Sequence, residues 1–145
     1  GEGDRIVVRG AGAYRATDIE TAAYPGLATD LQPPTGGLLT QAAGRSTVHE
    51  TIYEDRLEWL TDLGLMGARA EIIDDHHAVI DGPTRLQGSE VEVGDLRAGA
   101  SLILGALAAH GSSTIRGVHH VRRGYEDIEG KLLELGARIE QEPAG

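Results

Sequence analysis

Apolar residues recur along this chain with two alternating spacings, one typical of helices and one typical of short strands. Positions 98–109 are apolar almost throughout, which predicts a helix that is buried on every side. Over 57–66 and again over 125–135, apolar residues recur every third or fourth position with polar residues between them. This spacing predicts two amphipathic helices, each with one face in water.

Short runs of β-type residues separate these helical segments. They predict strands over 6–8, 17–21, 47–50, 70–73, 78–80 and 113–117. The polar stretch 74–77 falls between two of these runs and predicts a hairpin turn. Helices and strands therefore alternate, which is typical of an α/β fold.

The same order of parts occurs twice, over 29–72 and over 94–140. Each copy begins with an Asp-Leu pair, runs through an apolar helical stretch, a β-type run and an arginine, and ends near a Gly-Ala-Arg sequence. An internal repeat of this kind predicts two similar structural units. We expect two β-α-β-α-β-β units over about 16–82 and 83–142, with 1–15 as the last strand of a preceding unit.

Composition narrows the classes of function. The 145 residues are 40% hydrophobic but include no Phe and one Trp, so the core must be built mainly from Ala, Leu, Ile and Val. A net charge of −10 without a basic run argues against nucleic acid and anionic membranes as partners, although a few arginines can still hold a small anionic substrate. Cysteine is absent, which excludes disulfides and thiolate metal sites. No signal peptide or long apolar run is visible, so we expect a cytoplasmic protein.

Two aspartates occupy equivalent places in the two copies. Asp30 and Asp95 each stand at the start of an apolar helix. An aspartate there commonly caps the helix by accepting hydrogen bonds from its first free N–H groups, and spacing alone favours this role. Asp30, however, follows a Pro-Gly turn at the end of a strand, a usual place for substrate contacts. A catalytic or binding carboxylate is therefore the alternative.

Three arginines stand within or just before the first turn of predicted helices. Arg56, Arg97 and Arg123 would each face the positive end of a helix macrodipole, where a cation is disfavoured. One explanation is that each guanidinium, together with the helix start, binds a carboxylate or phosphate, which makes these arginines candidate substrate-binding residues. The other is that each pairs with a neighbouring acid on the surface, such as Asp55 or Glu126.

The stretch 74–77 (Asp-Asp-His-His) contains residue types that bind metals. Adjacent residues on a turn rarely converge on one ion, and no further cluster of ligands accompanies them, so we expect a solvated turn and no metal. The neighbouring histidines at 119 and 120 receive no catalytic role.

Four motifs in register resemble a known enzyme family. They read YPGLATDLQ over 24–32, HETIYEDR over 49–56, GDLRAGASL over 94–102 and RGYEDIEGKL over 123–132. Their order and spacing are similar to the C-terminal third of the UDP-N-acetylglucosamine 1-carboxyvinyltransferases, and the likeness runs over nearly the whole chain. The motifs of the sibling family that acts on 3-phosphoshikimate fit poorly.

This resemblance implies a two-domain enzyme in which each domain has three β-α-β-α-β-β units, with helices buried inside, sheets outside and the active site between the domains. The chain would then be part of the C-terminal domain. The implied reaction transfers the enolpyruvyl group of phosphoenolpyruvate to the 3′-hydroxyl of UDP-N-acetylglucosamine and releases phosphate, the first committed step of peptidoglycan synthesis. No metal or organic cofactor is implied.

The resemblance also implies roles for individual residues. Asp30 would bind the sugar and accept its hydroxyl proton, and Ile52 would contact the UDP-sugar through its backbone. Arg123 would bind phosphoenolpyruvate and stabilise the charge of the tetrahedral intermediate. Arg97 and Asp95 would shape the same anion pocket.

Other features depart from the family pattern. The acid that protonates the methylene carbon and the lysine that binds phosphoenolpyruvate lie upstream of the matched segments, so we expect the chain alone to be inactive and to act with the N-terminal half of the enzyme. The stretch 33–37 (Pro-Pro-Thr-Gly-Gly) is an unusual helix beginning, and Arg122 stands where the family commonly has an acid.

The alternative function is a non-catalytic UDP-sugar-binding domain or the partner chain of a split enzyme. In either case the helix that begins near Asp95 would lack a neighbouring unit, so we expect an exposed apolar face and self-association.

Overall fold

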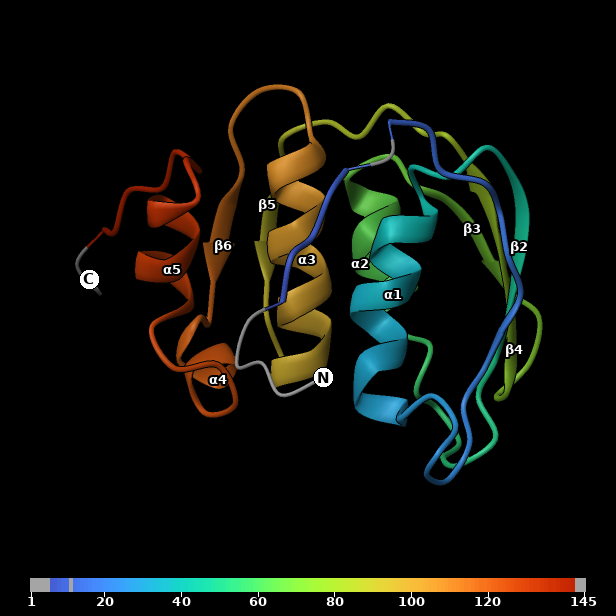
Figure 1. Cartoon of the computed structure of the whole chain (residues 1–145). Coiled ribbons are helices and arrows are strands. Elements are labelled where there is room, and N and C mark those ends of the chain that lie inside the picture. The colour runs from blue at the N-terminus through green and yellow to red at the C-terminus, as the bar shows by residue number, and fades with distance from the viewer. Residues whose placement is uncertain (1–5, 11, 143–145) are drawn as a thin grey trace.

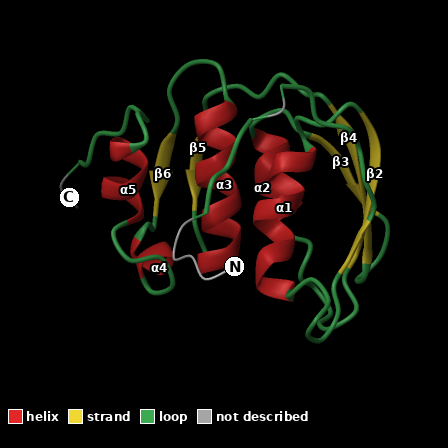
Figure 2. Cartoon of the chain, viewed as in Figure 1, coloured by secondary structure: helices red, strands yellow, loops and turns green. Residues whose placement is uncertain are grey.

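Three helices lie side by side between two sheets in the computed structural model, which describes residues 6–10 and 12–142 (Figure 1). The helices span Thr29–Leu31 (η1, a 3₁₀ turn), Gln32–Leu39 (α1), Trp59–Leu65 (α2), Leu96–Ala108 (α3), His119–Arg122 (α4) and Ile128–Glu134 (α5). The strands span Ile19–Glu20 (β1), Gly44–His49 (β2), Arg69–Ile72 (β3), His77–Gly82 (β4), Glu90–Glu92 (β5) and Thr114–Arg116 (β6). Figure 2 shows α1, α2 and α3 between the two groups of strands, as expected for an α/β fold with helices inside and sheets outside.

The larger sheet has the strand order β1-β2-β4-β3. β1 pairs with β2 in parallel, and β2 pairs with β4 antiparallel, with Ser46 opposite Ile80. Side chains alternate along β2, so that Ser46 and Val48 are buried while Arg45 and Thr47 are exposed. One face of this sheet therefore packs on the helices, and the other faces solvent.

The smaller sheet holds β5 and β6, which pair in parallel with Val91 opposite Ile115. The sequence predicted β6 but not β5, because Glu-Val-Glu contains a single apolar residue and gives no strand signal. The larger sheet ends at Gly82 and β5 begins at Glu90. The division into two units near residue 83 stays a prediction.

The strands predicted over 17–21, 47–50, 70–73 and 78–80 are confirmed within a few residues as β1, β2, β3 and β4, with 74–77 at the hairpin turn between β3 and β4. The strand predicted over 6–8 is wrong, since these residues pair with no strand among the described residues. Ile6 and Val8 are largely exposed, so no packing surface holds them in a sheet. Residues 1–5 and 11 of the predicted preceding unit lie outside the described part of the chain.

The unusual helix beginning at 33–37 has a packing explanation. Pro33 and Pro34 stand in the first turn of α1, where backbone N–H groups have no partner inside the helix, so proline removes no bond. Gly36 and Gly37 face the neighbouring elements: a Cβ on Gly36 would collide with the ring of Trp59, and one on Gly37 would lie 2.9 Å from the Ser101 hydroxyl. The two glycines therefore let α1 approach α2 and α3 closely.

The amphipathic helix predicted over 57–66 is confirmed. Leu57, Leu60, Leu63 and Met66 are all buried in the core, although α2 itself begins only at Trp59. The helix predicted over 125–135 corresponds to α5, which spans Ile128–Glu134. Leu135, expected on its apolar face, is exposed.

α3 departs from the prediction that it is buried on every side. Leu102 and Ile103 belong to the core, but Leu104 and Leu107 are 41% and 43% exposed. These two side chains are left uncovered, so an apolar strip of α3 faces outward.

None of the helices in the described residues combines the length and the apolar character that a membrane span requires.

Candidate functional site

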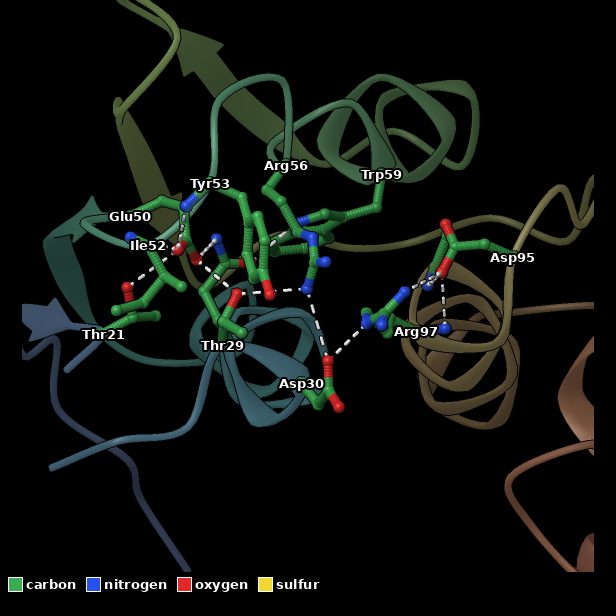
Figure 3. A network of polar contacts seen from close by, with 12 residues as sticks. Thr21, Thr29, Asp30, Glu50, Ile52, Tyr53, Arg56, Trp59, Asp95 and Arg97 are labelled. Atoms are coloured by element: carbon green, nitrogen blue, oxygen red, sulfur yellow. Dashed lines mark hydrogen bonds and ion pairs between the residues drawn. The ribbon is translucent and has the colours of Figure 1, made fainter. Parts of the chain in front are cut away.

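The Asp30 carboxylate lies between two arginines that come from distant parts of the chain (Figure 3). Its Oδ1 accepts a hydrogen bond from Nε of Arg97 and another, at 3.3 Å, from Nη1 of Arg56. Arg97 is 67 residues away in sequence, so this contact joins the two predicted units. Asp30 makes no cap bond, and α1 begins after Leu31, so the capping role that spacing favoured is wrong for Asp30.

Asp95 does act as a helix cap. Its Oδ1 accepts hydrogen bonds from the backbone N–H groups of Arg97, at 2.7 Å, and Ala98, at 3.3 Å. These N–H groups at the start of α3 are therefore already occupied, and the positive charge that remains available there comes from guanidinium groups. The Arg97 guanidinium also lies 3.8 Å from Asp95, so two carboxylates offset the unfavourable place of this cation at a helix start.

The arginines set the charge state of Asp30. The hydrogen bond from Arg97 holds the pKa of Asp30 below its usual range. Partial burial opposes this shift, and the charges of Arg97 and Arg56 add to it. The same hydrogen bond raises the pKa of Arg97. Asp30 is therefore an ionised, largely exposed carboxylate whose Oδ2 accepts no hydrogen bond from the described residues.

Arg56 is held on three sides. Its Nη1 donates to the hydroxyl of Thr29 at 3.2 Å as well as to Asp30, and its guanidinium lies 4.1 Å from the ring centre of Tyr53. It precedes α2 by three residues, as predicted, but pairs with Asp30 rather than with the adjacent Asp55. A shallow pocket of about 60 Å³ opens beside Arg56 and Arg97, with Trp59 and the start of α3 in its wall.

Glu50 was not predicted as a site residue, and it organises the segments around Asp30. This side chain is fully buried at the end of β2, and its carboxylate accepts hydrogen bonds from Thr21, Thr29, Gln32, Ile52 and Tyr53. Buried positions alternate along β2 at Ser46 and Val48, and position 50 continues that alternation, so the strand period places this acid on the inner face once the structure shows which face that is.

Ile52 lies in the loop that follows β2, and its side chain is 42% exposed. Its backbone N–H donates to Glu50 Oε1 at 2.9 Å. The N–H group is therefore unavailable to a ligand, and the backbone contact expected for Ile52 is limited to its carbonyl oxygen.

Arg123 is not part of this network. It directly follows α4 rather than starting a helix, and α5 begins five residues later at Ile128 with Asp127 as its cap. The prediction of a helix-start position for Arg123 is therefore wrong, because the segment folds as two short helices rather than one. The side chain is exposed and forms no ion pair within the described residues.

Arg123 nevertheless lies on a segment that touches α3. A Cβ added to Gly124 would lie 3.1 Å from Cδ1 of Leu96, the first residue of α3. The neighbouring Arg122 binds Glu129 through Nε at 2.9 Å, so the basic residue found where the family commonly has an acid is already paired. Its charge therefore adds little to the field around Arg123.

The polar groups of the turn at 74–77 form hydrogen bonds within the turn. Asp74 accepts hydrogen bonds from the backbone N–H groups of His76 and His77 and contacts the His77 ring at 2.8 Å. In the described part of the chain, no three histidine or acidic side chains converge in a way that could hold a metal ion.

Comparisons with known proteins identify the family of this chain. The family model for EPSP synthase (3-phosphoshikimate 1-carboxyvinyltransferase) matches residues 1–132. UDP-N-acetylglucosamine 1-carboxyvinyltransferase of Solibacter usitatus is 48% identical over 134 residues, which cover 92% of this chain and 32% of that protein. UDP-N-acetylglucosamine 1-carboxyvinyltransferase 2 of Listeria monocytogenes is 44% identical and covers 99% of this chain and 34% of that protein. The chain thus spans about a third of the length of these curated relatives.

Solved structures agree. The enolpyruvyl transferase NikO from Streptomyces tendae superposes with a TM-score of 0.82 at 34% identity, over 92% of this chain and 31% of that one. EPSP synthase from Acinetobacter baumannii superposes with a TM-score of 0.63 at 16% identity, over 78% of this chain and 26% of that one, which is a likeness of fold alone. These matches confirm the resemblance inferred from the four motifs, and the chain belongs to the EPSP synthase family of carboxyvinyltransferases.

Proposed function

We propose that the chain forms part of an enzyme that transfers the enolpyruvyl group of phosphoenolpyruvate to the 3′-hydroxyl of UDP-N-acetylglucosamine. The observation that carries this proposal is the exposed Asp30 carboxylate held by Arg56 and Arg97 at the start of α3. Relatives at 44% and 48% identity bear the name of this activity and come from bacteria. A role in peptidoglycan synthesis in the bacterial cytoplasm belongs to the same proposal.

Asp30 is suited to the sugar. One carboxylate oxygen receives both arginines, and the other is open within the described residues, so it can accept a hydrogen bond from the reacting hydroxyl and then its proton. Ile52, whose N–H donates to Glu50, would contact the UDP-sugar through its carbonyl oxygen.

The anionic reactant is assigned to the guanidinium groups. Each arginine has N–H donors beyond those given to Asp30, and a planar guanidinium suits a carboxylate or phosphate. Arg56 and Arg97 would hold the anion on the Asp30 side, with Asp95 orienting Arg97. Arg123 would reach the same anion from the loop after α4 and stabilise the charge of the tetrahedral intermediate.

The 145-residue chain should release no phosphate when it is mixed with both substrates. It contains no cysteine, and its one lysine, Lys131, lies in α5 beside Glu126 at 3.8 Å, so neither the expected proton donor nor the expected phosphoenolpyruvate-binding lysine is supplied. An oriented second reactant and a proton donor together account for many kcal/mol of barrier. A phosphate-release assay checks this, and turnover on the order of 1 per second by the chain alone would contradict it.

The lack of these two groups also favours a second candidate, a UDP-sugar-binding domain without catalysis. The two candidates differ when the missing part is supplied. Adding the separately produced N-terminal two thirds of the Solibacter usitatus relative should restore phosphate release if the chain is part of the enzyme. A binding domain would retain UDP-N-acetylglucosamine affinity and give no turnover in that mixture.

We also propose that the chain self-associates through the exposed strip of α3. Leu104 and Leu107 expose apolar surface to water. Contact with a second copy of the chain would remove this surface from water, which is favourable. Light scattering at rising concentration should show dimers or larger species, and Leu104→Lys combined with Leu107→Lys should shift them to monomer. A monodisperse monomer of the unmodified chain at all concentrations would refute this.

A further inference from the structure

We propose that Glu50 is a positioning residue for the UDP-sugar site: its buried carboxylate fixes the segments that carry Asp30, Ile52 and Arg56. The inference rests on the proposed function, because it assigns Glu50 a purpose at that same site. In this role Glu50 touches neither substrate and acts through the residues that it holds.

The hydrogen-bond pattern around Glu50 requires an acceptor at both oxygens. Oε1 accepts from the Thr21 hydroxyl at 3.0 Å and from the backbone N–H groups of Ile52, at 2.9 Å, and Tyr53, at 3.2 Å. Oε2 accepts from the Thr29 hydroxyl at 2.9 Å and from Nε2 of Gln32 at 3.3 Å. Figure 3 shows the Glu50 carboxylate between Thr21 and Thr29, with Ile52 and Tyr53 beside it.

Each of the two threonine hydroxyls also accepts a hydrogen bond from another group. Thr21 Oγ1 receives the backbone N–H of Thr51 at 2.8 Å, and Thr29 Oγ1 receives Nη1 of Arg56 at 3.2 Å. Each hydroxyl therefore directs its own hydrogen toward Glu50. The five groups around the side chain all donate to it, so the site suits a side chain that accepts at both oxygens.

A buried carboxylate without a cation is costly, so its retention calls for a reason. Among the described residues, no arginine, lysine or histidine side chain pairs with the Glu50 carboxylate; the His76 ring contacts only the backbone carbonyl oxygen of Glu50, at 2.7 Å. The donors come instead from the residue after β1, from η1 and the start of α1, and from the loop after β2, so all three segments contact this one carboxylate.

The bonds from Thr29, Ile52 and Tyr53 lead to the site residues. Thr29 precedes Asp30 and holds Arg56, so the Glu50–Thr29 bond orients both. The bonds to Ile52 and Tyr53 fix the loop after β2. The Arg56 guanidinium packs over the ring of Tyr53 in this loop. Glu50 thus places the carboxylate, the arginine and the Ile52 carbonyl relative to one another, which is the second layer of support that a precise binding site needs.

The test is Glu50→Gln, which keeps the size of the side chain but removes its charge and places an N–H donor beside groups that donate to the carboxylate. Calorimetry should show the dissociation constant for UDP-N-acetylglucosamine raised at least about tenfold. Amide exchange should be faster at Ile52 and Tyr53, because their N–H groups would then donate to a neutral amide oxygen, a weaker acceptor than a carboxylate.

The matched control is Leu86→Ala, which removes buried apolar volume beside Gly105, in the C-terminal half of α3 and away from the site. At a temperature where both variants are folded, this control should leave the dissociation constant and the two amides unchanged. If Glu50→Gln binds as the unmodified chain does, or if Leu86→Ala weakens binding as much, the positioning role is overturned.

Failure of the proposed function gives a different result. If the unmodified chain binds no UDP-N-acetylglucosamine, the substrate assignment fails, and the amides of Ile52 and Tyr53 alone judge Glu50: unchanged protection in Glu50→Gln overturns its role, and faster exchange supports it. Should Glu50→Gln not fold, Thr29→Val removes the link to both Glu50 and Arg56 without placing a donor against the carboxylate. Unchanged affinity in Thr29→Val would likewise overturn the inference.

Discussion

Replacing Asp30 with alanine should abolish measurable binding of UDP-N-acetylglucosamine to this chain, with the dissociation constant raised at least about a hundredfold. The variant removes the one carboxylate between Arg56 and Arg97 and leaves two guanidinium groups without their partner. Hydrogen bonds to charged groups contribute more than neutral ones, so the loss is large. Calorimetry on the unmodified chain and the variant measures it directly.

Asp81→Ala is the matched control for this experiment. Asp81 is a partly exposed aspartate that is also bound to an arginine, with both oxygens paired to Arg45 at 2.8 Å on the outer face of the larger sheet. Its removal breaks the same kind of ion pair away from Asp30 and should leave affinity unchanged. Equal loss of binding in both variants, or normal binding by Asp30→Ala, would contradict the assignment of Asp30 to the sugar.

The pH dependence of binding follows from the same contacts. Because the Arg97 hydrogen bond lowers the pKa of Asp30, the carboxylate stays ionised below the ordinary aspartate value of about 3.9. The stability that this contact contributes is present above the unfolded-state pKa and is lost as pH falls through the lower folded-state pKa. Binding should therefore be constant from pH 7 to about pH 5. A decline in affinity within that range would show that another group controls binding.

The sequence predicted the elements that rest on simple periodicity and was less successful where tertiary contacts decide. Spacing placed Leu57, Leu60, Leu63 and Met66 in the core because a helix of that period has one apolar face. It did not reveal β5, whose partner β6 lies 24 residues further on and supplies the pairing that Glu-Val-Glu does not signal.

The site shows the same division. Asp30 and Asp95 have equivalent local sequences, yet only Asp95 caps a helix: Asp30 lies within the 3₁₀ turn before α1, and its carboxylate pairs with Arg97 of α3. No local rule predicts that choice, since the arginine comes from the other predicted unit. Arg97 was recognised from its disfavoured place at a helix start, whereas the same reasoning misplaced Arg123, because the break between α4 and α5 depends on Asp127 in a left-handed conformation.

Gly36→Ala should lower the free energy of unfolding by about 1–3 kcal/mol, even though alanine is the better helix former. The added methyl group would collide with the Trp59 indole, with Cζ2 of the ring at 2.8 Å. Trp59 is buried and cannot move freely, because its Nε1 donates to Gln32 at 2.8 Å. For a chain of this length, thermal denaturation should show the midpoint falling by roughly 2–4 °C per kcal/mol lost.

Gly64→Ala isolates the collision from the helix propensity. Gly64 lies within α2, and a Cβ there would meet nothing within 4 Å, so this variant should gain up to about 1 kcal/mol of stability. The Trp59–Gln32 bond continues to Glu50, so Gly36→Ala should also weaken UDP-N-acetylglucosamine binding while Gly64→Ala does not. If both glycines respond alike, the close approach of α1 to Trp59 contributes nothing to stability or to the site, and the glycine pair at 36–37 needs another explanation.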